Sequence, residues 1–335
     1  MIVPTRLVVL ATSLAAPLAL LALSSTATTA APSIERVVTL GDSYSAGTGI
    51  HRDSSDYDDH GPRAQTFAAS TRIGDSDCSR ELDETPGPQL AARIGAESVF
   101  VACAGARIAD VANQIDSARI PDDGAGTVVT MTIGGNDLRT VRGENWPAIL
   151  VRCITSAGCD SSEKNQIANL DQIRADLTAV YVAIGEQYPD MSVRVLGYPR
   201  LMQSDRWCEG VTGFGRGEAD WVDDQVDRLN TVISSAVGSA SRVTGADIRY
   251  VSVIEQFDNH GACRFWQRDR YVNDAVFGET LSRSLTASGE VRDHWDDGPL
   301  TISGASFHPS TKGYDAYFAA LSASIADLAG ATLSR

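Results

Sequence analysis

Apolar residues along the chain fall into short β-branched runs that alternate with longer helical patterns. Five runs predict strands, at Val37–Leu40, Ser98–Ala102, Thr127–Ile133, Val193–Leu196 and Ile248–Val253. Helical patterns lie between and after them, at Gln89–Ile94, Asn165–Gln187, Glu218–Thr244 and Thr311–Leu328. Such alternation predicts an α/β fold, with a parallel sheet covered by helices on both faces.

Small and polar residues follow the first three predicted strands. Ser43 comes after the first strand, Gly105 after the second and Asn136 after the third. Ligands of open parallel sheets bind at the carboxyl ends of the strands. We therefore expect these three residues to lie at the functional edge of the sheet.

Two stretches read as insertions on this core. Residues 48–85 are polar and acidic, whereas residues 256–298 are rich in aromatic and charged side chains. Long loops in a compact domain are often functional. In the first stretch His51 and His60 flank several aspartates, but the spacing matches no EF-hand or zinc template, which favours a solvated loop over a metal site.

The first thirty residues, 1–30, have the layout of a secretory signal peptide. Arg6 is their one charged residue, an apolar stretch covers Leu7–Leu23, and small residues follow up to Ala30. This layout predicts cleavage near Ala30 or Ala31. The alternative is an uncleaved anchor, since the apolar stretch approaches the length of a membrane span. The small residues favour cleavage and export, and residues 34–330 are then expected to form one domain.

The acidic balance of the chain bears on its partners. The 335 residues carry a net charge of −15, which becomes one unit more negative without Arg6. Such a surface disfavours nucleic acid and anionic membranes as partners. We interpret the charge as a source of solubility outside the cell.

The cysteines form an even set in a chain that is expected to be exported. They are Cys78, Cys103, Cys153, Cys159, Cys208 and Cys263. An even number in an exported chain favours three disulfides over metal binding, although six cysteines allow 15 pairings. No Cys-x-x-Cys spacing occurs, so a zinc or redox site has little support.

Candidate chemistry begins with a serine and a distant histidine. Ser43 stands in Gly-Asp-Ser-Tyr-Ser at the end of the first predicted strand, and His308 stands in Phe-His-Pro near the end of the chain. Serine needs a base to act as a nucleophile, and histidine has a suitable pKa. The glycine-marked turns at 104–106 and 134–137 are suited to supply backbone and amide donors to a developing oxyanion.

These four pieces, in this order, resemble the SGNH (GDSL) hydrolase family. The elbow of the α/β-hydrolases is a poorer match, because position 45 is serine and that elbow normally lies in the middle of the chain. The resemblance implies a three-layer α/β/α sandwich with a central, mostly five-stranded parallel sheet. It also implies that residues 34–330 form a hydrolase domain.

The resemblance implies a role for one residue in each of the four blocks. It implies Ser43 as nucleophile, His308 as base, and an oxyanion hole made by the main-chain N–H groups of Ser43 and Gly105 and the side-chain amide of Asn136. Gly105 as a plain tight turn and Asn136 as a turn-stabilising side chain are compatible alternatives. The other histidines, His51, His60, His260 and His294, are expected to be loop residues.

The sequence departs from the family at the position of the carboxylate residue that usually completes a catalytic triad. Most members place an aspartate three residues before the histidine, whereas this chain has Ala305 there. Some secreted bacterial esterases and lipases of the family act as Ser-His dyads. We therefore expect a dyad in which the main-chain carbonyl of Ala305 or Ser306 orients the imidazole. A carboxylate from Asp296 or Asp297 is the less favoured alternative.

Neighbouring residues are expected to have supporting roles. The family implies that Asp42 and Asp137 bond local backbone, whereas Tyr44 and Trp266 are open between an acyl pocket and simple packing. For the cysteines, the resemblance implies pairing in chain order. The implied disulfides are Cys78–Cys103, Cys153–Cys159 and Cys208–Cys263.

The function implied by the resemblance is that of a secreted serine esterase or lipase that works through an acyl-enzyme, without metal or organic cofactor. Phospholipase A and polysaccharide deacetylase activities of the same fold are alternatives. A non-catalytic binding protein is a further alternative, disfavoured because all four key residues are present. We expect an ester or lipid substrate, no stable membrane insertion after cleavage of the signal, and a monomer, since one chain would hold the whole dyad.

Overall fold

A computed structural model describes residues 34–50, 78, 84–121, 123–155, 158–159, 166–203, 208, 214–263, 270–274, 280–285, 291–296, 306–326 and 328. The predicted signal peptide and most of the first predicted insertion lie outside these residues. The division of the chain into a leader and one hydrolase domain remains a prediction.

The described core is built on a five-stranded sheet. Its strands are β1 (Arg36–Gly41), β2 (Glu97–Phe100), β3 (Thr127–Thr132), β4 (Ser192–Leu196) and β5 (Ile248–Val251). They run parallel in the order β2-β1-β3-β4-β5. Every residue of β3 is buried, as expected of a central parallel strand that is covered on both faces. All five predicted strands are confirmed.

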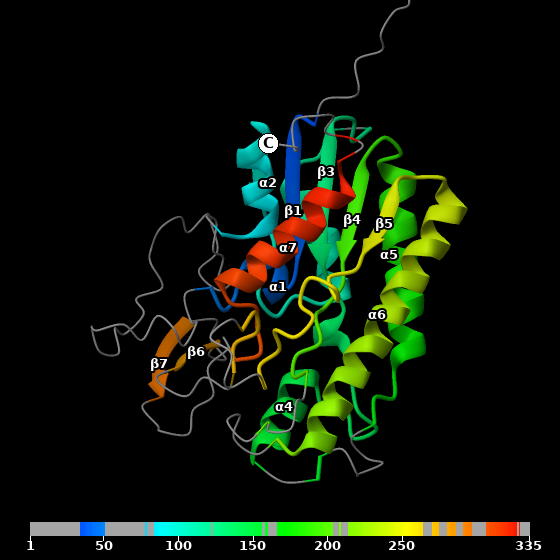
Figure 1. Cartoon of the computed structure of the whole chain (residues 1–335). Helices are drawn as coiled ribbons and strands as arrows, with labels where there is room; N and C mark the ends of the chain where they lie inside the picture. Colours follow the sequence, from blue (N-terminus) through cyan, green and yellow to red (C-terminus); the bar gives the residue numbers. More distant parts are fainter. Residues whose placement is uncertain are drawn as a thin grey trace, which may run out of the picture. The chain divides into compact units, whose positions relative to one another are not determined.

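Helices cover both faces of this sheet (Figure 1). On one face α2 (Pro86–Ile94) packs beside α7 (Thr311–Ser324). On the other face α5 (Leu170–Gln187) packs along α6 (Arg216–Thr244). The expected three-layer α/β/α arrangement is therefore confirmed.

Several short elements were not predicted from the sequence. They are α1 (Ser43–Ala46), α3 (Val111–Ala118), α4 (Trp146–Thr155), the 3₁₀ turns Ile108–Asp110 and Gly135–Asp137, and an antiparallel pair, β6 (Thr280–Leu285) and β7 (Val291–Asp296). Of these, α1 has four residues and each 3₁₀ turn has three, which is too short for a helical period to stand out. The β6–β7 pair forms part of the second predicted insertion.

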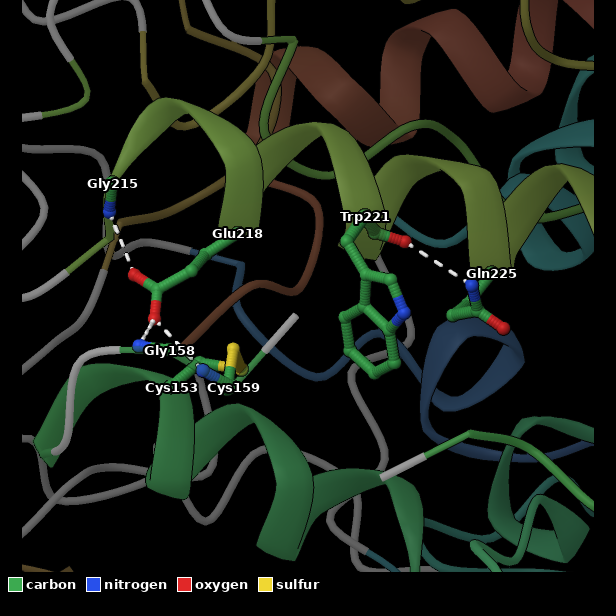
Figure 2. Close-up of a disulfide and its surroundings, with 7 residues drawn as sticks. All are labelled: Cys153, Gly158, Cys159, Gly215, Glu218, Trp221 and Gln225. Atoms are coloured by element: carbon green, nitrogen blue, oxygen red, sulfur yellow. Dashed lines mark hydrogen bonds between the residues drawn. A yellow bond between two sulfur atoms is a disulfide. The ribbon is translucent and has the colours of Figure 1, made fainter. Parts of the chain in front are cut away.

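The cysteines form three disulfides, Cys78–Cys103, Cys153–Cys159 and Cys208–Cys263. Figure 2 shows how the second of these is attached to α6 through Glu218. The buried Glu218 carboxylate accepts main-chain N–H groups from Gly158 at 2.5 Å, Cys159 at 3.0 Å and Gly215 at 2.7 Å. The last bond caps the start of α6, so one carboxylate fixes both the disulfide loop and the helix.

The described residues contain neither a candidate membrane span nor a candidate metal cluster. None of their helices combines the length and apolar character needed to cross a membrane. No group of three or more His, Cys, Asp or Glu side chains among them is arranged to hold a metal ion.

Candidate active site

The site begins at the sharp exit of the chain from β1. Gly41 has a φ of +110°, and a Cβ there would lie 2.2 Å from the carbonyl oxygen of Thr132, so only glycine fits. The Gln114 amide accepts the Gly41 N–H at 2.7 Å and donates to the Gly41 carbonyl at 2.9 Å. Asp42 then caps α1, which places Ser43 as the first residue of that helix.

Ser43 and His308 meet although they are far apart in the sequence. The Ser43 Oγ lies 2.8 Å from Nε2 of His308, and Nδ1 of His308 lies 3.1 Å from the carbonyl oxygen of Ser306. A carbonyl oxygen only accepts, so the ring proton is assigned to Nδ1 and Nε2 is left to accept the serine proton. This is the geometry of a nucleophile beside a general base.

The surroundings favour the neutral form of the imidazole. Burial lowers the pKa of His308 to about 4, and the hydrogen bond to the Ser306 carbonyl offsets only part of that effect. At neutral pH the ring is therefore unprotonated at Nε2 and free to take a proton.

A second segment stabilises the loop that carries His308, the histidine loop. Asn273 donates its main-chain N–H to the His308 carbonyl at 2.9 Å and accepts the Phe307 N–H at 3.2 Å. Its side-chain amide donates to the Gly49 carbonyl at 2.9 Å. Asn273 is buried and comes from the second predicted insertion, so that insertion links the histidine loop to the turn after α1.

The three expected oxyanion donors follow adjacent strands. Ser43, Gly105 and Asn136 come after β1, β2 and β3, whose carboxyl ends share one edge of the sheet. The Ser43 N–H belongs to the first turn of α1, where an N–H has no acceptor within the helix. Gly105 has a φ of +83° in an open turn.

Asn136 is fixed by one of its two amide hydrogens. Its Nδ2 donates to the Ala106 carbonyl at 2.9 Å, which ties the turn after β3 to the turn after β2. An asparagine amide has two N–H donors, so this bond leaves the second one available. The bond to Ala106 is a turn-stabilising contact, and the second N–H is compatible with the expected donor role.

Asp42 lies at the centre of a buried polar network. Its carboxylate accepts the Tyr44 N–H at 3.1 Å, the Thr132 hydroxyl at 2.7 Å and a short hydrogen bond from the Tyr198 hydroxyl. Burial raises the pKa of Asp42 to about 6, against the opposing effect of these three hydrogen bonds. The expected local backbone bond is present, and the two hydroxyls join it.

The remaining sequence expectations concern neighbours of the site. Asp137 accepts the Ile108 N–H at 3.1 Å, and its main-chain oxygen accepts from Asn169 at 2.8 Å. The Tyr44 ring lies 4.8 Å from the His308 ring, measured between centroids, and its hydroxyl donates to the Phe307 carbonyl at 2.6 Å. His260 is a loop residue, stacked on the ring of Tyr271.

Several expected residues lie outside the described part of the chain. They are His51, His60, Trp266, Asp297 and Ala305, together with the side chains of His294 and Asp296. Of the two carbonyls expected to orient the imidazole, Ser306 is the one observed at His308 Nδ1.

Sequence reasoning missed Tyr198, Thr132, Gln114 and Asn273. Tyr198 had a detectable signal, because it follows the predicted fourth strand and so belongs to the same sheet edge as Ser43. Asn273 had none, since its contacts are made by main-chain groups and an amide within a long loop.

Known proteins of one family are similar to this chain over most of its length. The GDSL-like lipase/acylhydrolase family matches residues 37–321. The chain is 30% identical to Lipase 1 of Streptomyces coelicolor over 257 residues, which cover 76% of this chain and 81% of that protein.

Two solved structures share the fold. An extracellular lipase from Streptomyces rimosus has a TM-score of 0.58 and 23% identity, with 86% of this chain and 99% of that chain covered. A phospholipase A1 from Streptomyces albidoflavus NA297 has a TM-score of 0.56 and 23% identity, with 88% and 99% covered. The family match spans most of the sequence, and the chain therefore belongs to the GDSL-like lipase/acylhydrolase family and is a carboxylic ester hydrolase.

Proposed function

We propose that this hydrolase cleaves esters through an acyl-enzyme on Ser43, with His308 as general base and the Ser306 carbonyl orienting the imidazole. The observation that carries the proposal is the 2.8 Å contact between Ser43 Oγ and His308 Nε2, with Nδ1 engaged by a main-chain oxygen. The dyad needs no carboxylate in this arrangement, because the carbonyl already fixes the tautomer and the direction of the ring.

The first half of the reaction acylates the serine. Ser43 Oγ attacks the ester carbonyl carbon and its proton passes to Nε2 of His308. The C–O bond to the alcohol then breaks, and the leaving oxygen takes that proton from the imidazolium. In the second half a water attacks the acyl carbon, gives its proton to Nε2, and the Ser43 oxygen leaves and recovers it. The products are an alcohol and a carboxylic acid.

Stabilisation of the tetrahedral intermediates is assigned to three donors. These are the main-chain N–H groups of Ser43 and Gly105 and the second amide hydrogen of Asn136. Support comes from their position after adjacent strands and from the Asn136–Ala106 bond, which holds the amide in place. Preorganised donors of this kind are usually the largest single contribution to acyl transfer.

The proposal extends to the compartment and the partners. The leader pattern and three disulfides support export to an oxidising environment, with cleavage of residues 1–30. The relatives named as lipases support an ester or lipid substrate. A monomer without stable membrane insertion and without nucleic acid completes the proposal, in line with the acidic surface and a dyad held within one chain.

The test is hydrolysis of p-nitrophenyl esters from acetate to palmitate by the oxidised protein. Ser43→Ala and His308→Ala are expected to lose turnover on every ester, while the wild-type chain-length optimum separates a deacetylase from an esterase or a lipase. Stoichiometric labelling of wild type by a fluorophosphonate, absent in Ser43→Ala, is the matching chemical result. Full activity of either variant would contradict the dyad.

A further inference from the structure

The residue before the histidine has an unusual backbone. Phe307 has a φ of +59°, in the left-handed region that residues other than glycine seldom enter. It lies between Ser306, whose carbonyl contacts Nδ1, and His308, which carries the ring. The contact between the ring and a carbonyl two residues earlier therefore depends on a backbone conformation that Phe307 does not prefer by itself.

Tyr44 contacts this loop in two ways. Its hydroxyl donates to the Phe307 carbonyl at 2.6 Å, and its ring lies 4.8 Å from the imidazole with an angle of 38° between the planes. Burial raises the pKa of Tyr44, so the hydroxyl stays protonated and remains a donor. The ring is supported in turn by an edge contact with Tyr198, at a centroid distance of 5.1 Å.

We propose that Tyr44 is a positioning residue for His308, whose hydroxyl holds the Phe307 carbonyl and whose ring supports the imidazole, so that the Ser306 carbonyl stays on Nδ1. This inference rests on the proposed Ser43–His308 dyad. Tyr44 follows the nucleophile directly in α1, so one helical turn supplies both the attacking oxygen and the support for its base.

The groups around the imidazole suit this role. Ser43 and Tyr44 contact it from α1, and the loop segment that bonds to the main chain of His308 contributes the uncharged Asn273. The nearest acidic residue in sequence to Ser43 is Asp42, whose carboxylate is bonded to Thr132 and Tyr198 instead. Tyr314 of α7 donates to the main-chain oxygen of Thr48 at 3.0 Å.

The experiment compares Tyr44→Phe, Tyr44→Leu and a matched control, Tyr317→Phe. The control removes an equivalent buried bond, from the Tyr317 hydroxyl to the Gly197 carbonyl at 2.7 Å. Loss of the Tyr44 hydroxyl is expected to lower kcat roughly tenfold with KM unchanged, the effect of one hydrogen bond. Loss of the ring in Tyr44→Leu is expected to lower kcat about a hundredfold, because a misplaced base costs that much.

A pH profile separates positioning from a loss of general stability. In Tyr44→Leu water gains access to the imidazole, so the acid limb of kcat/KM is expected to rise by about one pH unit toward the ordinary value of histidine. In Tyr317→Phe both kcat and the limb are expected to match wild type, even where its melting temperature falls as much as that of Tyr44→Phe.

The outcomes distinguish this inference from the proposed dyad. Wild-type kcat and an unmoved acid limb in folded Tyr44→Leu, alongside inactive Ser43→Ala and His308→Ala, would overturn the role of Tyr44 and leave the dyad intact. Equal losses of kcat in Tyr44→Phe and Tyr317→Phe would also overturn it, since the effect would then follow stability. Active Ser43→Ala or His308→Ala would overturn both.

Discussion

The Tyr198 hydroxyl donates a hydrogen bond to the buried carboxylate of Asp42 and also accepts the Gly135 N–H at 3.0 Å. Burial and the Asp42 charge raise the pKa of Tyr198, so its hydroxyl remains a donor. One side chain at the end of β4 thus connects the residue before Ser43 with the residue before Asn136. Two hydrogen bonds of one hydroxyl thus connect the direct chain neighbours of the proposed nucleophile and of a proposed oxyanion donor.

Tyr198→Phe is expected to lower kcat about tenfold, because both bonds of the hydroxyl are lost while the ring still fills its space. Tyr181→Phe is the matched control, since the Tyr181 hydroxyl is buried and has no hydrogen-bond partner in the described part of the chain. Steady-state kinetics of the two variants on a short ester provide the measurement. Equal kcat values for both would show that the Tyr198 link is irrelevant to turnover.

Removal of the proposed side-chain donor is the second prediction. Asn136→Ala is expected to lower kcat by about a hundredfold to a thousandfold, the usual cost of one oxyanion donor. KM should change little, because the donor acts on charge that develops after substrate binding. A variant that raises KM but keeps kcat would assign Asn136 to substrate binding instead.

The sequence was sufficient to single out Ser43 and His308 as candidates, because each stands in a short local pattern. Ser43 ends an apolar strand run and His308 stands in a short motif before a helix, so neither depended on knowledge of distant contacts. Tyr198 and Asp42 are 156 positions apart, and their bond exists only because β4 and β1 flank β3 in the same sheet. The hydrogen-bond network around Asp42 therefore depends on the order of the strands in the sheet. A short stretch of the sequence cannot reveal it.

The choice between a dyad and a triad gives the third prediction. The double variant Asp296→Ala/Asp297→Ala is expected to keep most of its kcat, since the Ser306 carbonyl already accepts from His308 Nδ1. Turnover of p-nitrophenyl butyrate, beside His308→Ala as the inactive reference, measures this. A loss on the order of a thousandfold would instead favour a carboxylate that completes a triad.

The pH dependence of kcat/KM is the fourth prediction. His308 acts as a base only when neutral, so activity should persist as the pH falls and decline around the pKa of about 4. Ester hydrolysis from pH 3.5 to 8, stopped with alkali before p-nitrophenol is read, would record this limb. Asp42, with a pKa of about 6, is tested by Asp42→Asn. If kcat/KM of wild type fell with an apparent pKa near 6, and this fall disappeared in Asp42→Asn, the titrating group would be Asp42. That result would contradict the prediction.

Stability should also depend on pH through a buried carboxyl distant from the dyad. Asp223 on α6 accepts the main-chain N–H groups of Met202 at 2.9 Å and Gln203 at 2.7 Å. Burial raises the pKa of Asp223 to about 6 from the ordinary value of 3.8, although these bonds oppose the shift. Between the two values the folded chain binds a proton that the unfolded chain does not, so folding gains stability as the pH falls through 6.

For Asp223 this gain is about 1 kcal/mol between pH 7.5 and pH 5. Asp223→Asn keeps one of the two acceptor oxygens and cannot titrate, so its free energy of unfolding is lowered overall but should rise less over the same interval. Urea denaturation of both proteins at the two pH values, with the disulfides intact, measures the difference. The same pH dependence in wild type and Asp223→Asn would show that Asp223 is ionised in the folded protein throughout, which its burial argues against.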